Sequence, residues 1–285
     1  MRASSLLAVI VLAAGGAPFN AQSSHSPSVK DVIARAGRFA EQQRDALTSV
    51  RADEHYSQEL QFHDLTLTER RQLESEVAFV RLSDSDEWLA FRNVLRVDGV
   101  DTGTDPARLE KLFREGAASN QGRRIAEENA IYNIGRLYRT FNIPTFALHI
   151  LMPQNSQRFS FKKISESQAG GEGVWEIEYE ERERPTIVRS LDGRRIPIKG
   201  RMWIVPAEGR LVRATLHASV PVTSELEFEW RHDPNLNAWV PSEMRERYRR
   251  ILYEKSPPRQ PRYYDIISRA TYGNYRRFGV DVKIR

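Results

Sequence analysis

Apolar and charged residues alternate along most of the chain after Arg158. The alternation is clearest over Trp175–Glu180, Val222–Arg231 and Met244–Arg249. A period of two, with one apolar and one charged face, predicts antiparallel strands that are half buried against a core. Turn sequences such as Asp192-Gly193 separate these segments. We therefore expect a meander of antiparallel strands that curls over one core.

The N-terminal part of the chain predicts a helix and then strands. Over Ser28–Val50 apolar residues recur at helical spacing, and Asp31 follows Ser28 at the spacing of a capping box. Three strands are predicted after this helix, at Tyr56–Phe62, Leu73–Leu82 and Glu87–Val97.

Between these strands and Arg158 the pattern becomes helical again. Asp105 followed by Pro106 is a favoured helix start, and a second helix is predicted over Gln121–Ile134. The segment Thr145–Met152 is apolar on nearly every side but too short to cross a bilayer. It must be buried in the protein or cover something apolar. We interpret residues 105–152 as a helical insert in the sheet.

The first 21 residues have the order of a secretory signal peptide. Arg2 precedes the apolar run Leu6–Ala14, and small residues follow, with cleavage expected after Ala21 or Ala17. We therefore expect export to the periplasm or the extracellular space, and a single domain over residues 22–285. No other stretch approaches the roughly 18 apolar residues of a membrane span, so no stable membrane insertion is expected.

Charged residues are numerous but do not indicate a nucleic-acid partner. The formal net charge is +5, and acidic residues accompany basic ones nearly everywhere. Such mixed signs are typical of a solvated surface. Three predicted strands each carry one sign on their polar face, and cross-strand ion pairs would favour the correct strand order if these strands are neighbours. The residues are Glu176, Glu178 and Glu180; Glu225, Glu227 and Glu229; and Arg245, Arg247 and Arg249.

The sequence carries none of the common local motifs of catalysis or metal binding. The absence of cysteine excludes disulfides, thiol nucleophiles and thiolate metal sites. None of the six histidines stands in a HExxH or HxH pair, and no GxSxG, P-loop or GxGxxG sequence occurs. We therefore predict no catalytic residue, no metal and no cofactor. A hydrolase with carboxylates from distant parts of the chain is a less favoured alternative.

The apolar faces of two predicted strands are rich in aromatic residues. Ordinary core packing explains them if the strands share a sheet. The alternative is a cavity, lined by a concave sheet face and roofed by helices, that holds an apolar ligand. The candidate lining residues are Trp175, Ile177, Tyr179, Leu226, Phe228 and Trp230. The candidate lid residues are Phe146, Leu148, Ile150 and Leu151.

A late segment of the chain resembles a known family. The sequence Gly200–Pro206 (GRMWIVP) is followed by Gly209–Arg213 (GRLVR), and Val222–Trp230 and a Val-Pro pair lead into the closing strands. This order resembles the periplasmic lipoprotein-carrier superfamily, which includes LolA-like and LppX-like proteins. In that superfamily a W-I-D-P turn and a G-x-x-x-R sequence form a hairpin. Val205 stands where the family commonly has aspartate.

The resemblance covers Gly200–Arg285 and the first helix, and it implies an α+β fold. A strongly curved antiparallel β-sheet would form an incomplete barrel, with helices covering its open side. Family members carry or sense lipids, acyl chains or lipoproteins in that cavity. The leading hypothesis is an exported carrier or envelope factor whose partner is a lipid, an acyl chain or a lipoprotein. The alternative is a structural or protein-interaction module of the cell envelope with a solid core.

Overall fold

A computed structural model describes residues 26–63, 68–81, 88–115, 124–125, 127–128, 130–136, 139, 141–169, 171–190, 193–219, 222–253 and 261–278. The predicted signal peptide and much of the predicted helix over Gln121–Ile134 lie outside these residues. In the described part of the chain, no helix combines the length and the apolarity needed to cross a membrane.

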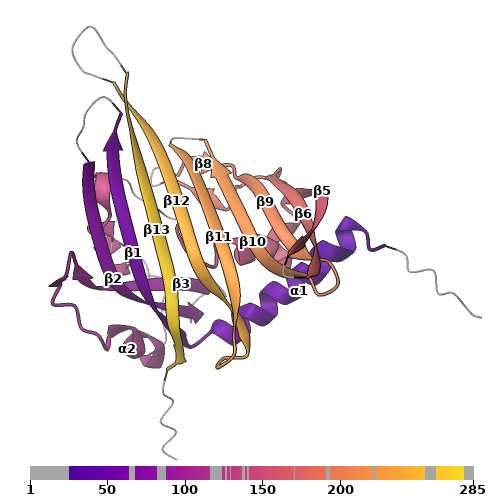
Figure 1. The fold of residues 1–285 in the computed structure, drawn as a ribbon, viewed down its shortest axis with the longest axis horizontal. Coiled ribbons are helices and arrows are strands. Elements are labelled where there is room, and N and C mark those ends of the chain that lie inside the picture. The colour runs from indigo at the N-terminus through magenta and orange to yellow at the C-terminus, as the bar shows by residue number, and fades with distance from the viewer. Residues whose placement is uncertain are drawn as a thin grey trace, which may run out of the picture.

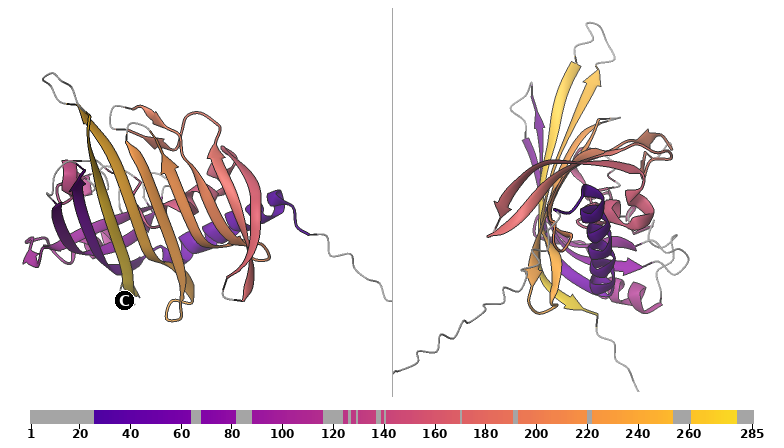
Figure 2. Two further views of the ribbon diagram at one scale, coloured as in Figure 1. Left: turned by 45° about the horizontal axis from the view of Figure 1, so that its top comes forward. Right: turned by 90° about the vertical axis from the view of Figure 1, so that its right-hand side faces the viewer.

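The described residues build one antiparallel sheet of eleven strands (Figure 1). The strand order is β4-β3-β2-β1-β13-β12-β11-β10-β9-β6-β5, so the last strand of the chain pairs with the first. β4 and β5 form the two edges, and the sheet is therefore not closed. It curls around helix α1 as an incomplete barrel (Figure 2).

The strands of this sheet are long in its centre and short at one edge. Their bounds are β1 Val50–Phe62, β2 Thr68–Arg81, β3 Trp88–Val97, β4 Val100–Asp101, β5 Phe159–Ala169, β6 Glu172–Glu181, β9 Lys199–Val205, β10 Arg210–Ala218, β11 Thr223–Asp233, β12 Ala238–Tyr253 and β13 Pro261–Arg277. A separate two-stranded ladder joins β7, Val188–Arg189, to β8, Arg195–Ile196.

Helix α1, Val29–Leu47, begins where the sequence predicts it. The Asp31 backbone N–H donates to the Ser28 hydroxyl at 3.2 Å, and the Ser28 N–H donates to the Asp31 carboxylate at 3.1 Å. This capping box satisfies donors that a helix start leaves unpaired. The chain turns at Ser49, which has a φ of 73°, and β1 then starts at Val50. Because of this turn, β1 begins at Val50, before Tyr56, where the predicted strand begins.

The turn between β9 and β10 holds α1 against the sheet. Gly209 has a φ of 75°, and a Cβ on it would lie 2.3 Å from the Arg35 carbonyl carbon. The Arg35 guanidinium donates to the Pro206 carbonyl oxygen at 2.9 Å. A glycine at this position therefore lets the hairpin and the helix backbone meet. The segment that resembles the carrier superfamily thus positions α1.

The other helices whose bounds lie within the described residues are short. They are α2 Arg108–Glu115, η1 Ile134–Arg136, α4 Phe146–Leu151 and α5 Pro153–Ser156. The helix predicted from Asp105 starts at Arg108, because the Asp105 side chain accepts from the Ala107 N–H at 2.9 Å and so forms a turn first. Helix α2 helps to cover a small second core on β2 and β3. The buried residues of that core are Ala78, Val80, Phe91, Leu109, Leu112, Ile125 and Phe278.

The main hydrophobic core lies on the side of the sheet that faces α1 and α4, which we call the inner face. The opposite side, called the outer face, carries the charged residues of the alternating strands. The predicted fold class is confirmed: the chain forms one large, curved, open antiparallel sheet with helices on its open side.

Candidate functional site

All six candidate lining residues lie on the inner face. β6 and β11 are not neighbours, because β9 and β10 stand between them. Two rows of residues connect the strands in register. The rows are Tyr179, Gly200, Leu216 and Leu226, and then Ile177, Met202, Ala214 and Phe228. Trp175 and Trp230 are buried on the same face, and all six candidates belong to one hydrophobic cluster with α1.

Gly200 allows Tyr179 to reach across β9. A Cβ at Gly200 would lie 2.8 Å from the Tyr179 hydroxyl and 1.9 Å from the Thr215 carbonyl oxygen. The Tyr179 hydroxyl donates to that carbonyl at 2.9 Å. Burial, reinforced by the charge of Glu181, raises the pKa of Tyr179, so the hydroxyl remains a neutral donor. The inner face is therefore closely packed at this row.

The candidate lid residues form α4, which lies next to α1 and β10. Leu148, Ile150 and Leu151 are fully buried, and Phe146 is partly buried. The helix has six residues and no side-chain hydrogen bond at its N-cap, Thr145. Because so short a helix is marginal by itself, packing against the sheet and α1 holds α4 in place.

Sequence analysis missed a group of buried polar residues on the inner face of the other half of the sheet. We call Glu54, Tyr56, Arg92, Arg139, Glu246 and Tyr248 the polar network. The side chains of Arg139 and Glu246 are 0% exposed and lie 3.9 Å apart. The Tyr56 and Tyr248 hydroxyls donate to the two oxygens of Glu246 at 2.9 and 2.5 Å.

Both carboxylates of the polar network have cationic partners. Arg139 donates to the Tyr56 hydroxyl and to the Ile134 carbonyl. Arg92 donates to both Glu54 oxygens, at 2.5 and 2.8 Å, and its guanidinium lies 4.7 Å from the centre of the Tyr56 ring. Such pairing offsets the large desolvation cost of buried charge.

Burial controls protonation in the polar network. It raises the pKa of Tyr56 to about 12, against the opposing charge of Arg139 and together with the charge of Glu246. Burial disfavours the charge of Arg92, but the adjacent Glu54 raises the pKa of Arg92 overall. At neutral pH Tyr56 is therefore a neutral donor and Arg92 a cation.

The sequence contained one signal of this network. Glu246 stands between Met244 and Tyr248, so it is an acidic residue on an apolar strand face. Its partner Arg139 lies in the predicted helical insert, outside any alternating pattern. No local spacing connects the two residues, and only the fold brings them together.

Three buried polar groups on the inner face lack a hydrogen-bond partner in the described part of the chain. The Trp230 indole N–H, the Arg139 Nε and the Tyr272 hydroxyl are buried and have no hydrogen-bond partner among the described residues. Buried donors in folded proteins are usually paired with protein, water or a ligand. These three groups therefore have capacity for a polar partner.

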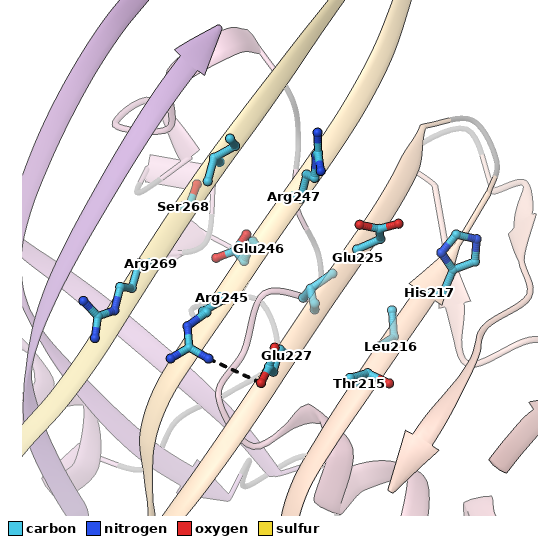
Figure 3. A pocket seen from close by; sticks show the side chains of 12 residues that line it. Thr215, Leu216, His217, Glu225, Glu227, Arg245, Glu246, Arg247, Ser268 and Arg269 are labelled. Carbon is cyan, nitrogen blue, oxygen red and sulfur yellow. Dashed lines mark hydrogen bonds and ion pairs between the residues drawn. The ribbon is translucent and has the colours of Figure 1, made fainter.

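The outer face carries the predicted ladders of charge. β11 and β12 are neighbours, and Arg245 donates to Glu227 at 3.3 Å (Figure 3). Arg245 also donates to Glu229 at 3.1 Å. This confirms the predicted pairing of the acidic and basic strands. Glu176 on β6 instead pairs with Arg201 on β9 at 2.7 Å, because β9 is its neighbour in the sheet.

A hollow of about 590 Å³ lies on the outer face across β10 to β13 (Figure 3). His217, Glu225 and Ile267 are among its lining residues. Beside it, Arg249 and Arg247 donate to Asp265, and their guanidiniums hold the pKa of that carboxyl well below its usual range. Among the described residues, no three histidine or carboxylate side chains are grouped closely enough to hold a metal ion.

Comparisons with known proteins show similarity at the level of fold. No protein-family model and no curated protein matches the chain. A DUF1329 family protein from Desulfovibrio piger matches with 11% identity and a TM-score of 0.40, over 90% of this chain and 95% of that chain. A putative outer membrane lipoprotein-sorting protein domain from Vibrio parahaemolyticus matches with 10% identity and a TM-score of 0.39, over 88% and 95%.

A LolA superfamily protein from Nitrosomonas europaea matches with 9% identity and a TM-score of 0.36, over 91% of this chain and 97% of that chain. It bears the name of the superfamily that the sequence motifs resemble. At these identities the likeness concerns the fold alone.

Proposed function

We propose that this protein is an exported carrier that holds the apolar chain of a lipid or of a lipidated partner between the inner face and α4. The observation that carries the proposal is the continuous apolar inner face of β6, β9, β10 and β11 beneath a short helix. Residues 22–285 would form this one carrier domain. Its place of work would be the periplasm or the extracellular space.

The apolar half of the inner face suits an acyl chain. Its two rows present aromatic and aliphatic side chains from four adjacent strands, with no charged residue in either row. Apolar surfaces of this kind favour hydrocarbon over water by roughly 25 cal/mol for each Å² that is buried.

The unpaired donors on the inner face suit the polar head of an amphiphile. Trp230 on β11 and Tyr272 on β13 are buried on the inner face, and the indole N–H and the hydroxyl have no hydrogen-bond partner among the described residues. A lipid ester or carboxylate supplies the acceptors that such donors need. A ligand with an apolar chain and a polar head would therefore satisfy both parts of the face.

Entry of a ligand requires movement of α4. The candidate lining residues are buried against α1 and α4, so the chain of a ligand must displace packed side chains. Gly37 on α1 keeps α4 close, since a Cβ there would lie 3.2 Å from the Leu151 carbonyl oxygen. The lid has little helical stability of its own, which lowers the cost of moving it.

Titration with cis-parinaric acid, a fluorescent fatty acid, tests the proposal. The expected result is saturable binding that palmitate displaces. Phe228→Leu should weaken binding by about threefold to tenfold, or roughly 0.7–1.4 kcal/mol, because it removes ring contacts on the inner face. Native mass spectrometry of protein purified from its exported compartment should show a bound lipid.

The matched control is Trp203→Leu. Trp203 is an aromatic residue of β9 that lies on the outer face against Arg213. This substitution should leave the affinity for parinaric acid unchanged. Absence of saturable binding, or equal effects of the two substitutions, would overturn the proposal.

A second candidate function is the interaction module with a solid core. The nearly complete burial of the six candidate lining residues favours it. In that case Trp230→Ala should cost about 3–5 kcal/mol of unfolding free energy, the usual loss for a truncated core aromatic. A stable Trp230→Ala protein with weakened binding of parinaric acid would instead exclude the solid core.

A further inference from the structure

Two hydroxyl groups flank a carboxylate on the inner face without donating to it. Ser75 on β2 and Tyr272 on β13 stand opposite Glu54 on β1, so the three residues form one row. The row faces inward, because Glu54 lies two residues before Tyr56 of the main core. The two Glu54 oxygens accept from Arg92, at 2.5 and 2.8 Å. The Ser75 and Tyr272 side chains are 4% and 5% exposed, and their hydroxyls have no hydrogen-bond partner among the described residues.

Other unpaired donors lie on the same face. The Trp88 and Trp230 indole N–H groups are buried without a hydrogen-bond partner in the described part of the chain, and both residues belong to the main core. The ring centres of Trp230 and Phe228 are 6.2 Å apart, so Trp230 borders the apolar rows. The inner face therefore offers hydrogen-bond donors, and a partner must supply acceptors.

Negative charge is disfavoured at this row. Arg92 already pairs with Glu54, and Arg139 already pairs with Glu246. Burial, reinforced by the charges of Glu54 and Glu246, raises the pKa of Tyr272 well above its ordinary value. The same surroundings would oppose an anion bound at this hydroxyl, because a buried charge without its own counter-ion is costly.

An ester is the acceptor group that fits these conditions. It has two oxygen acceptors, no hydrogen-bond donor and no charge. A carboxylate would bring a negative charge to a row whose buried charges are already paired. An amide would add a further N–H to a face where several donors already lack partners among the described residues.

We propose that the Tyr272 hydroxyl receives the ester carbonyl of an uncharged acyl lipid. Ser75 on β2 and Trp230 on β11 lie two strands away on either side of Tyr272 and supply further donors. The acyl chain would lie on the apolar rows that Trp230 borders. This inference rests on the carrier proposal and narrows it, because it selects a neutral ester over a free fatty acid.

Competition against bound cis-parinaric acid tests the inference with ligands that differ only at the head. The competitors are methyl laurate, laurate and lauramide, which share a twelve-carbon acyl chain. At pH 8 we expect methyl laurate to displace the probe at about tenfold lower concentration than laurate, because only laurate is charged. Lauramide should also be weaker than methyl laurate. If parinaric acid does not bind at all, the carrier proposal itself fails. If it binds and laurate competes as well as methyl laurate, only the ester inference fails.

Tyr272→Phe removes the unpaired hydroxyl and keeps the ring. It should raise the concentration of methyl laurate needed for displacement by about threefold to tenfold, the usual effect of one hydrogen bond, and leave that of laurate unchanged. Because the hydroxyl has no partner among the described residues, urea unfolding should show no loss of stability. Ser75→Ala should give a smaller change of the same kind.

The matched control is Tyr275→Phe. The Tyr275 hydroxyl lies on the same strand but already donates to the Pro241 carbonyl oxygen at 2.5 Å. This change should lower the unfolding free energy and leave the preference for methyl laurate over laurate unaltered. An unchanged preference in Tyr272→Phe would overturn the inference, since it would mean that water alone occupies the hydroxyl.

Discussion

The two halves of the inner face are stabilised in different ways. The half formed by β6, β9, β10 and β11 depends on shape, because aromatic and aliphatic side chains pack in rows under α1 and α4. The half formed by β12, β13, β1 and β3 also contains paired charges: Arg139 and Glu246 are fully buried, and Arg92, whose side chain is 14% exposed, pairs with the buried Glu54.

The two halves of the inner face differ in how much rearrangement of side chains they tolerate. An apolar face accepts another hydrocarbon group if neighbouring side chains shift, since its contacts are not directional. A buried ion pair accepts almost no rearrangement, because either partner left alone costs several kcal/mol. The apolar half is therefore the part in which side chains can rearrange at low cost. The polar network is the part suited to hold the sheet and the segment carrying Arg139 in place.

Removal of one charge from the polar network should have the largest effect. Glu246→Leu leaves Arg139 buried without its carboxylate and should cost about 3–5 kcal/mol of unfolding free energy in urea titration. Combining it with Arg139→Met should recover most of that loss. Glu225→Leu on the outer face is the control, expected within about 0.5 kcal/mol of the parent. A small loss for Glu246→Leu would contradict the difference between the halves.

Alkaline pH should lower the unfolding free energy through the polar half, and this is the second-largest expected effect. In the folded state the pKa of Tyr56 is raised from 10.0 to about 12. Its contribution is fully present below pH 10 and is lost as pH rises through 12, which corresponds to roughly 2–3 kcal/mol. Urea titrations between pH 8 and pH 12 measure this loss. Burial also raises the pKa of other tyrosines, Tyr248 and Tyr272 among them, so Tyr56→Phe should reduce the dependence without abolishing it. Tyr263→Phe, at an exposed position, should leave the dependence unchanged. Equal slopes for the two variants would count against the assignment.

A methyl group added to the apolar half should cost somewhat less. In Gly200→Ala the new Cβ meets the Thr215 carbonyl and the Tyr179 hydroxyl, so β9 must shift. We expect a loss of about 1–3 kcal/mol in thermal or urea unfolding, the usual cost of overpacking. The control is Gly273→Ala on β13, where a Cβ meets no atom within 4 Å. If Gly200→Ala is as stable as this control, the rows are not tightly packed.

The smallest effect is expected on the outer face. Arg245→Gln removes the ion pairs to Glu227, Glu229 and Glu243, in which the Arg245 side chain is 46% exposed. The loss should be below about 1 kcal/mol and should shrink further in high salt. A larger loss, or one that salt does not change, would mean that this ladder resembles the polar network more than a solvated surface.

Much of the fold follows from local patterns in the sequence. The alternation of Trp175, Ile177 and Tyr179 with glutamates predicted both the strand and the side that faces the core. The capping box at Ser28 predicted the start of α1. The strand starting at Val50 was predicted too short, because the turn at Ser49 depends on a left-handed backbone that the residue type does not announce.

The candidate site was predictable only in part. The lining residues were identified by the alternation of apolar and charged positions, and they lie on the inner face. The lid residues were identified because their segment is apolar on nearly every side, and they form α4 in the same hydrophobic cluster. The polar network was missed because Arg139 and Glu246 belong to segments that are distant in the chain. Whether the inner face receives a ligand stays a prediction.

The sequence by itself determined which residues face inward on most strands, since side chains alternate strictly along an extended backbone. It also determined the mixed-sign character of the outer face. Only the tertiary structure decided that the last strand pairs with the first, that Glu246 meets Arg139, and that Ser75 and Tyr272 flank Glu54. Periodicity reflects local backbone geometry, whereas strand order and the pairing of buried charges depend on which distant segments come into contact.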